Sequence, residues 1–195
     1  MLKFYHAPQS RSSGVLWLLE ELGADYEIEI VDIRAPGGAP ESYRAIQPNK
    51  KVPAIVHDGT IITERAAITT YLADAFPAAG LAPAIGDPRR GPYLTAIAYV
   101  DGVADPCIAA RAQGFTYDGH SFSFGTFDDM AAYLERRLSA QAYAAGDSFT
   151  AADTQIGSAV FYGLNVLGVL PDRPAFRDYL ARVTARPAFQ RAVAR

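Results

Sequence analysis

Hydrophobic positions in the first thirty residues follow a strand-like, then a helical, then again a strand-like period. Residues 2–6 alternate with a period of two, which predicts a short strand that runs into the polar loop 7–13. The apolar stripe over 15–22 predicts a helix, and Gly23 stands where a helix C-cap is expected. Residues 26–31 alternate again. We therefore expect a βαβ unit with two parallel strands joined through a helix.

A second group of elements follows a loop that is rich in proline, glycine and alanine. Residues 53–57 and 60–63 are apolar segments on either side of Asp58 and Gly59, a pair typical of a two-residue type I′ hairpin turn. A helical stripe over 67–75 comes next. The order β-α-β followed by β-β-α predicts a thioredoxin-like α/β domain.

The remainder of the chain predicts a second domain of another class. Segment 77–87 is rich in proline and glycine, so we expect it to link a thioredoxin-like domain over 1–76 to a C-terminal domain over 88–195. Every periodic segment in the C-terminal domain is helical. The expected helices span 92–112, 127–144, 151–167 and 174–185. This domain is predicted to be an all-α helical bundle.

Composition excludes several classes of protein. Half of the 195 residues are hydrophobic and the formal net charge is -3, so the chain can build a large core but has no basic field for nucleic acid. No apolar run approaches the roughly 18 residues that span a bilayer, so we expect a cytoplasmic protein without a membrane partner. The only cysteine is Cys107, which excludes a cysteine-rich metal site and a C-x-x-C pair. Any thiol chemistry must use a thiol from outside.

The most informative motif is Gln-Pro-Asn-Lys-Lys-Val-Pro-Ala-Ile, in which Pro53 starts a strand. A proline at a first strand position is often a cis bond. A cis bond here would leave the N–H and C=O of Val52 unpaired and ready to bind an extended peptide. By itself, Pro53 favours an ordinary proline at a strand start, and only its sequence context favours the cis bond.

An acidic residue follows this motif at the mouth of the next helix. Glu64 alone would be a favourable charge near the helix N-terminus, worth about 0.5 kcal/mol. Together with the proline motif, however, the segment 48–72 resembles the glutathione S-transferases. Their N-terminal domains carry N-P-x-G-x-V-P-A-L and then E-S-x-A-I-x-x-Y-L.

This resemblance implies a set of glutathione-binding residues. In the family, the residue before the cis-proline pairs through its backbone with the cysteinyl part of glutathione, which assigns that role to Val52 and Pro53. The acidic residue and its neighbour at the helix start hold the γ-glutamyl group, which assigns that role to Glu64 and Arg65. Lys51 matches a position that meets the glycine carboxylate.

The loop after the first strand also resembles this family. The segment 5–23 is similar to the bacterial and fungal branch with S-R-x-x-R-V-L-W-L-L-E-E-L-G. A free thiol has a pKa of about 8.5, so a transferase must stabilise the thiolate, and a serine hydroxyl near a helix N-terminus can do so. Ser10 is the first candidate. Ser12 competes with it, and Ser12 or Ser13 is expected to cap the helix. Tyr5 is a weaker candidate donor.

Three positions depart from the family pattern. Arg65 stands where serine is usual, so a guanidinium either replaces the hydroxyl with a charged contact or narrows the site by its bulk. Lys50 replaces a glycine, which is expected to matter little if its side chain points to solvent. Gly14 replaces an arginine, and the sequence offers no functional interpretation of this change.

The C-terminal half contributes a capping motif and candidate pocket residues. Thr150 and Asp153 form an expected capping box, which the family also has at this helix. Asp101 matches a cleft-lining helix segment and is a candidate for the γ-glutamyl amine, although a solvated helix carboxylate is the simpler interpretation. Three aromatic residues are candidates for the wall of the hydrophobic substrate pocket or for the core. They are Tyr93, Tyr99 and Phe115.

The resemblance implies a transferase that conjugates the glutathione thiolate to a hydrophobic electrophile. Glutathione is then the co-substrate, no metal is needed, and a homodimer is expected. Glutathione-dependent reduction, isomerisation or dehalogenation at the same site is an alternative. A transferase-like binding module without turnover is another. The absence of cysteine from the 7–13 loop argues against a glutathionyl-cysteine redox class.

Overall fold

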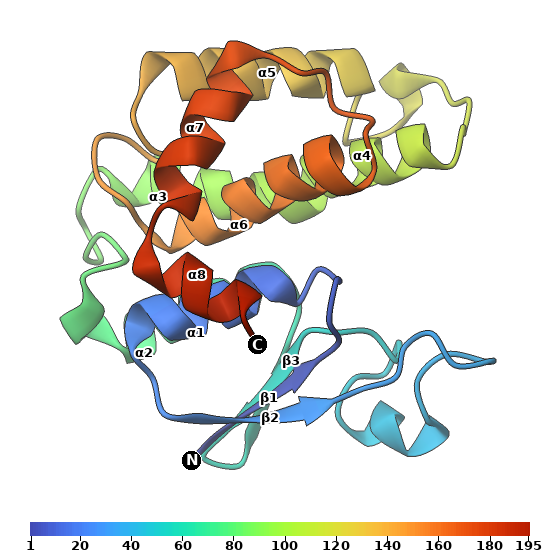
Figure 1. Cartoon of the computed structure of the whole chain (residues 1–195), viewed down its shortest axis with the longest axis vertical. Helices are drawn as coiled ribbons and strands as arrows, with labels where there is room; N and C mark the ends of the chain where they lie inside the picture. Colours follow the sequence, from blue (N-terminus) through green and yellow to red (C-terminus); the bar gives the residue numbers. More distant parts are fainter.

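The computed structural model describes residues 1–195 and contains one mixed sheet of four strands. The strands lie in the order β2-β1-β3-β4, with β1 parallel to β2 and antiparallel to β3 (Figure 1). The elements of this domain are β1 (Leu2–His6), α1 (Ser13–Leu22), β2 (Tyr26–Ile30), β3 (Ala54–His57), β4 (Thr60–Thr63) and α2 (Arg65–Ala75). Their order and pairing confirm the predicted thioredoxin-like arrangement.

The two faces of the sheet are covered differently. Leu2 and Phe4 of β1 belong to a core shared with α1 and α2, which lie between the sheet and the helical domain (Figure 1). Tyr5 faces the other side and packs on Tyr43 of a short 3-10 helix (Glu41–Ala45), with 5.5 Å between the ring centroids. The alternation of the first strand therefore separates a deeply buried face from a thinly covered one.

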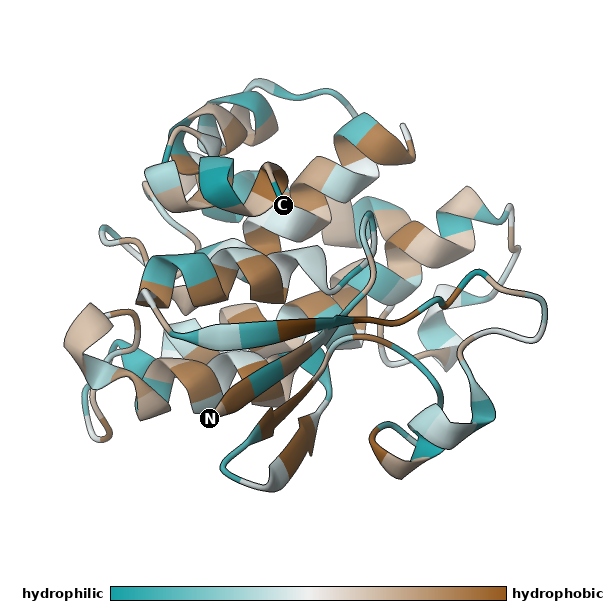
Figure 2. Cartoon of the chain, turned by 60° about the horizontal axis from the view of Figure 1, so that its bottom comes forward, coloured by the Kyte–Doolittle hydropathy of each residue, from teal (hydrophilic) through white to brown (hydrophobic).

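The hairpin turn between β3 and β4 has the predicted geometry. Asp58 and Gly59 both have positive φ angles, 49° and 83°, as a type I′ turn requires. Apolar residues recur along both strands of this hairpin (Figure 2). The turn prediction is confirmed.

The C-terminal domain is helical throughout, as predicted. Its helices are α3 (Arg90–Tyr99), α4 (Asp105–Ala112), α5 (Phe127–Ala140), α6 (Ala151–Phe161), α7 (Pro174–Thr184) and α8 (Pro187–Val193). A π-helical turn, Val100–Ala104, divides the predicted helix 92–112 into α3 and α4, and a second one, Tyr162–Val166, ends the predicted helix 151–167. α5 ends four residues earlier than 144. None of these helices combines the length and the apolar character that crossing a membrane requires.

Trp17 of α1 joins the two domains. Its buried ring lies 5.9 Å from the Phe149 ring and 4.9 Å from the Phe189 ring, measured between centroids. α6 passes close to it, because a Cβ on Gly157 would stand 2.9 Å from the indole. α8 returns from the end of the chain to pack on α1 (Figure 1). Buried residues of both domains therefore form one continuous core.

The N-terminus of α6 carries the predicted capping box. The Asp153 carboxylate accepts hydrogen bonds from the Thr150 backbone N–H at 2.8 Å and from the Ala144 N–H at 2.7 Å. It also accepts one from the Tyr179 hydroxyl at 3.0 Å. Because the carboxylate is fully buried, these bonds replace its lost hydration and tie α6 to the preceding loop and to α7.

Gly14 marks a close approach of α1 to α6. A Cβ at this position would lie 2.9 Å from the Ser158 Oγ and 3.1 Å from the Thr154 carbonyl oxygen. The serine hydroxyl can rotate away, but the carbonyl belongs to the helix backbone. Gly14 is therefore required by packing, which explains why the family's arginine is absent here.

We expect Gly14→Ala to lower the free energy of unfolding by about 1–3 kcal/mol, because overpacking outweighs the gain in helix propensity of about 1 kcal/mol. Gly91→Ala is the matched control, since Gly91 lies in α3 and a Cβ there meets nothing within 4 Å. Urea unfolding should leave the control at least as stable as the wild type. Equal stability of the two variants would contradict the close approach.

Candidate functional site

The register of the sheet brings three separate segments to one edge. Tyr5 at the end of β1 pairs with Ala54 at the start of β3, and Ala54 pairs with Thr63 at the end of β4. The loop that leaves β1, the segment that enters β3 and the N-terminus of α2 therefore lie side by side. Every candidate residue of the first domain except Tyr5, which lies within β1, belongs to one of these three segments.

The segment that enters β3 presents an unpaired backbone. The Val52–Pro53 peptide bond is cis, as predicted. The backbone ladder begins only at Ala54, and neither the N–H nor the C=O of Val52 makes a hydrogen bond within the chain. Val52 as a whole is buried, and its unpaired N–H and C=O are the polar groups that this edge offers to a ligand. This edge can pair with an extended peptide.

Gln47 organises this edge, a role that our reading of the sequence missed. Its buried side chain accepts a hydrogen bond from the Lys51 N–H at 3.0 Å and donates one to the Glu64 carboxylate at 3.4 Å. The amide thus connects the two segments that flank the ligand edge. The sequence feature that could have indicated this role is the position of Gln47 as the first residue of the proline motif.

Lys51 and Lys50 differ sharply in their surroundings. The Lys51 side chain is exposed and makes no ion pair within the chain, so its ammonium is free for an anionic ligand. Lys50 has a φ of 55°, in the left-handed region that explains the family's glycine. Its ammonium donates to the Gly37 carbonyl at 3.1 Å and pairs with Glu41. Lys50 therefore folds onto the preceding loop and does not point to solvent.

Glu64 stands in an unusual backbone conformation at the N-terminus of α2. Its φ of 65° and ψ of 121° are rare for a residue other than glycine, and such strain concentrates at functional sites. The following amide, the N–H of Arg65, makes no hydrogen bond within the chain, whereas the N–H of Ala66 donates to Asp101 at 3.0 Å. A free amide at a helix N-terminus can bind a carboxylate.

The loop after β1 contains a chain of three hydrogen-bonding side chains. The Ser12 Oγ lies 2.7 Å from the His6 Nδ1 and 2.7 Å from the Ser10 Oγ, and Ser12 is completely buried. Ser10 is only partly buried, and its hydroxyl donates to the Ala7 carbonyl at 2.8 Å. Of the two serine hydroxyls, Ser10 is the one that a ligand can reach.

Ser12 stands at the N-cap position of α1, as expected, but the capping hydrogen bond expected of its side chain is absent. α1 begins at Ser13, and the residue before it, Ser12, already has helical angles and makes no capping hydrogen bond with its side chain. The reason is that its hydroxyl is held by His6 and Ser10. No side-chain hydrogen bond of Ser13 is present either.

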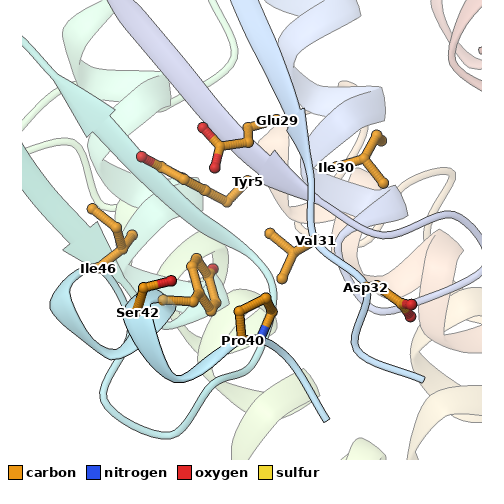
Figure 3. A pocket seen from close by; sticks show the side chains of 9 residues that line it. Tyr5, Glu29, Ile30, Val31, Asp32, Pro40, Ser42 and Ile46 are labelled. Carbon is orange, nitrogen blue, oxygen red and sulfur yellow. The ribbon is translucent and has the colours of Figure 1, made fainter. Parts of the chain in front are cut away.

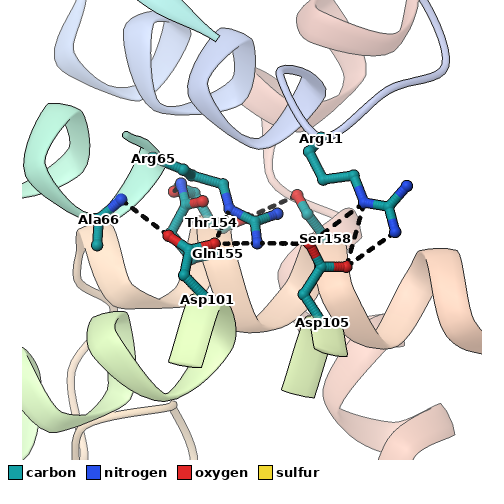
Figure 4. Close-up of polar contacts among 8 residues, drawn as sticks. All are labelled: Arg11, Arg65, Ala66, Asp101, Asp105, Thr154, Gln155 and Ser158. Atoms are coloured by element: carbon teal, nitrogen blue, oxygen red, sulfur yellow. Dashed lines mark hydrogen bonds and ion pairs between the residues drawn. The ribbon is translucent and has the colours of Figure 1, made fainter. Parts of the chain in front are cut away.

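The Arg65 side chain does not face the ligand edge. It is buried and extends toward the helical domain, where Nε donates to Asp101 at 2.7 Å and a terminal nitrogen pairs with Asp105 at 3.3 Å (Figure 4). Its guanidinium is thus neutralised by two carboxylates. The predicted direct contact of this guanidinium with a ligand carboxylate is not supported, and only the Arg65 amide remains available.

Arg11 completes this charge cluster, which our reading of the sequence also missed. Its guanidinium donates to Asp105 at 3.0 Å and lies 4.9 Å from the centroid of the Tyr162 ring (Figure 4). Asp105 directly follows one π-helical turn and Tyr162 begins the other. Both irregular turns thus supply partners to the loop that carries Ser10, in keeping with the frequent occurrence of π turns at functional sites.

The three aromatic candidates do not form one pocket wall. Tyr93 is completely buried in the core. Tyr99 is half-buried, with its ring centroid 4.4 Å from that of Tyr133. Phe115 is exposed and follows the C-terminal end of α4. Burial therefore removes Tyr93 from the pocket, whereas the predictions for Tyr99 and Phe115 stay open.

A hollow of about 170 Å³ lies on the thinly covered face of the sheet, and Ser10 is not among the residues that line it (Figure 3). Tyr5 points into it, which removes this hydroxyl from the thiolate site. The other lining residues are Glu29, Ile30, Val31, Asp32, Pro40, Ser42, Tyr43 and Ile46.

Comparison with protein families covers both domains. The glutathione S-transferase N-terminal domain matches residues 10–75, and the glutathione S-transferase C-terminal domain matches residues 124–187. The chain belongs to the glutathione S-transferase family. Glutathione S-transferase 3 of Schizosaccharomyces pombe is 29% identical over 202 residues, which cover 93% of this chain and 77% of that protein.

Solved glutathione transferases share the whole architecture. A glutathione transferase from Methylococcus capsulatus has a TM-score of 0.83 and 28% identity, and the alignment covers 100% of this chain and 98% of that one. A sphingomonad glutathione S-transferase complexed with glutathione has a TM-score of 0.80 and 27% identity, with 98% and 97% covered. The departures of this family member at Gly14 and Arg65 therefore occur within an intact family fold.

We expect Arg65→Met to lower the free energy of unfolding by about 1–3 kcal/mol, because Asp101 and Asp105 would lose their buried partner. Arg177→Met is the control, since Arg177 pairs with Asp172 on the surface, where both side chains are more than half exposed. Thermal or urea unfolding should show a change of less than about 0.5 kcal/mol for the control. A similarly small effect of Arg65→Met would contradict its structural role.

Proposed function

We propose that this protein is a glutathione transferase that joins the glutathione thiolate to an electrophilic carbon of a hydrophobic substrate. The observation that carries this proposal is the unpaired backbone of Val52, beside the cis-proline Pro53, at the same sheet edge as the Ser10 hydroxyl. The names of the relatives also favour conjugation over reduction, isomerisation, dehalogenation or a binding role without turnover.

Glutathione would lie along the ligand edge in an extended conformation. The N–H and C=O of Val52 pair with its cysteinyl residue, and the free ammonium of Lys51 meets its glycine carboxylate. At the other end, the Arg65 amide binds the γ-glutamyl carboxylate and Glu64 faces the γ-glutamyl amine. Asp101 adds negative charge near that amine, reduced by its pairing with Arg65.

Ser10 would stabilise the reactive form of glutathione. Its hydroxyl donates a hydrogen bond to the thiolate, and the N-terminus of α1 adds partial positive charge. Together they lower the pKa of a thiol that is about 8.5 in water. The thiolate then attacks the electrophilic carbon, a C–S bond forms, and the electron pair moves to the leaving group or the adjacent acceptor atom. Tyr99 and Phe115 are the candidate contacts for the electrophile.

We expect Ser10→Ala to lower kcat/KM for thiol conjugation about 100-fold, the usual effect of losing one donor to a developing anion. Binding to immobilised glutathione should persist, because the backbone contacts remain. Ser13→Ala is the control, since this hydroxyl makes no hydrogen bond in the chain. Full activity in Ser10→Ala would move the donor role to a backbone amide, and a wild type that neither binds glutathione nor turns over would refute the proposed function.

We also propose that the protein forms a homodimer through neighbouring elements of both domains. Ile61 of β4, Tyr71 of α2 and Leu94 of α3 are exposed apolar residues on elements that pack together. Leu94→Glu should shift the sedimentation coefficient toward that of a monomer. Val193→Glu, at an exposed position of α8, should not shift it.

A further inference from the structure

His6 is a buried titratable residue to which the proposed reaction assigns no part. It lies at the end of β1, directly before the loop of Ser10 and Ser12. Burial lowers its pKa from 6.5 to about 4, and no charged group contributes to this shift. The ring is therefore neutral at neutral pH and carries a proton on one nitrogen only.

The surroundings of the ring favour one tautomer. The Ser12 Oγ, 2.7 Å from Nδ1, is the only polar atom of the chain within hydrogen-bond reach of the ring. A proton on Nδ1 would be donated to this oxygen, whereas a proton on Nε2 would find no partner in the chain. The Ala7 carbonyl, 2.8 Å from the Ser10 Oγ, can only accept, so the Ser10 proton is donated there and Ser12 must donate to Ser10. The 2.7 Å contact between the Ser12 Oγ and Nδ1 then requires the proton on Nδ1.

This tautomer determines the direction of every proton in the loop. The Ser12 Oγ then accepts from His6 and from the Ala7 N–H at 3.2 Å, which fills both of its lone pairs. Its own proton goes to the Ser10 Oγ at 2.7 Å, since the Ala7 carbonyl is more distant at 3.2 Å.

The Ser10 Oγ also accepts from the Ser12 N–H at 3.2 Å, so both of its lone pairs are filled as well. Its proton, which the Ala7 carbonyl accepts in the protein without a ligand, can then be donated to a ligand instead. With the opposite tautomer, the Ser12 proton would turn to His6. The Ser10 proton would then be drawn inward to the Ser12 Oγ.

We propose that His6 is a positioning residue of the transferase reaction, which directs the Ser10 hydroxyl toward the glutathione thiolate through Ser12. The proposal rests on the proposed function for its ligand. Each donor in the series His6, Ser12 and Ser10 also polarises the next, which strengthens the last hydrogen bond to the thiolate. His6 itself does not touch the substrate.

Two substitutions distinguish the effect of the N–H donor of His6 from the effect of the shape of its ring. His6→Phe keeps an aromatic ring but has no N–H, whereas His6→Asn places a side-chain N–H close to the position of Nδ1. We expect His6→Phe to lower kcat about three- to tenfold, which corresponds to one hydrogen bond. It should raise the pKa of the bound thiol, measured from thiolate absorbance against pH. The KM for glutathione should change less than about twofold, and His6→Asn should recover most of the loss.

An unmoved thiol pKa in His6→Phe would overturn the proposal, as would equal losses in both variants. Nitrogen-15 NMR of the histidines in the ligand-free wild type supplies a test that depends on neither refolding of a variant nor glutathione binding. The His6 signals should show a protonated Nδ1 and a bare Nε2 at pH 7. A protonated Nε2 would overturn the proposal even if the protein is a transferase. Absence of glutathione binding with the expected tautomer would refute the proposed function instead.

Discussion

The ion pairing of Arg65 with Asp101 and Asp105 is the interaction on which the arrangement of the site depends. It joins the first turn of α2 to the helical domain at a buried position, and Arg11 extends it to the loop of the candidate hydroxyl. Two positive and two negative side chains balance one another there, so the cluster adds little net charge to the cleft. Because a buried arginine without its carboxylates is strongly unfavourable, these contacts favour one relative placement of α2, the Ser10 loop and α3–α4.

The two departures from the family pattern at this interface belong to the same packing arrangement. Gly14 approaches Thr154 and Ser158 of α6, and Figure 4 draws these two residues in one view with Arg65 and its carboxylates. α1 is too close to α6 for a side chain at position 14. Positive charge reaches the carboxylates from Arg11 and Arg65. The Arg65 side chain therefore contacts the helical domain and does not make the ligand contact that a serine hydroxyl would make at this position. The ligand edge retains the backbone amide of the same residue.

Local chemistry explains how much of the structure could be predicted from the sequence. The strands, the type I′ turn, the cis-proline and the capping box each depend on a few adjacent residues, and all were found. The direction of the Arg65 side chain was not, because its partners lie about 40 positions away and their orientation depends on a π-helical turn with no clear sequence signal. Tyr93 was assigned to a pocket for the same reason, since an aromatic residue on a helix does not reveal which face is covered. The Gln47 and His6 contacts required the sheet register.

The contrast between Ser10 and Ser12 shows how burial divides one motif into two roles. Both hydroxyls stand at the start of α1 and have the same intrinsic chemistry, but Ser12 is enclosed and its bonding capacity is satisfied within the chain. Such a group cannot respond to a ligand, yet it can orient a neighbour that does. Ser10, which keeps a face toward the ligand edge, can exchange its internal acceptor for an anion. The binding of a peptide at Val52 and the stabilisation of its thiolate therefore depend on different parts of the fold, the first on backbone geometry and the second on a buried polar network.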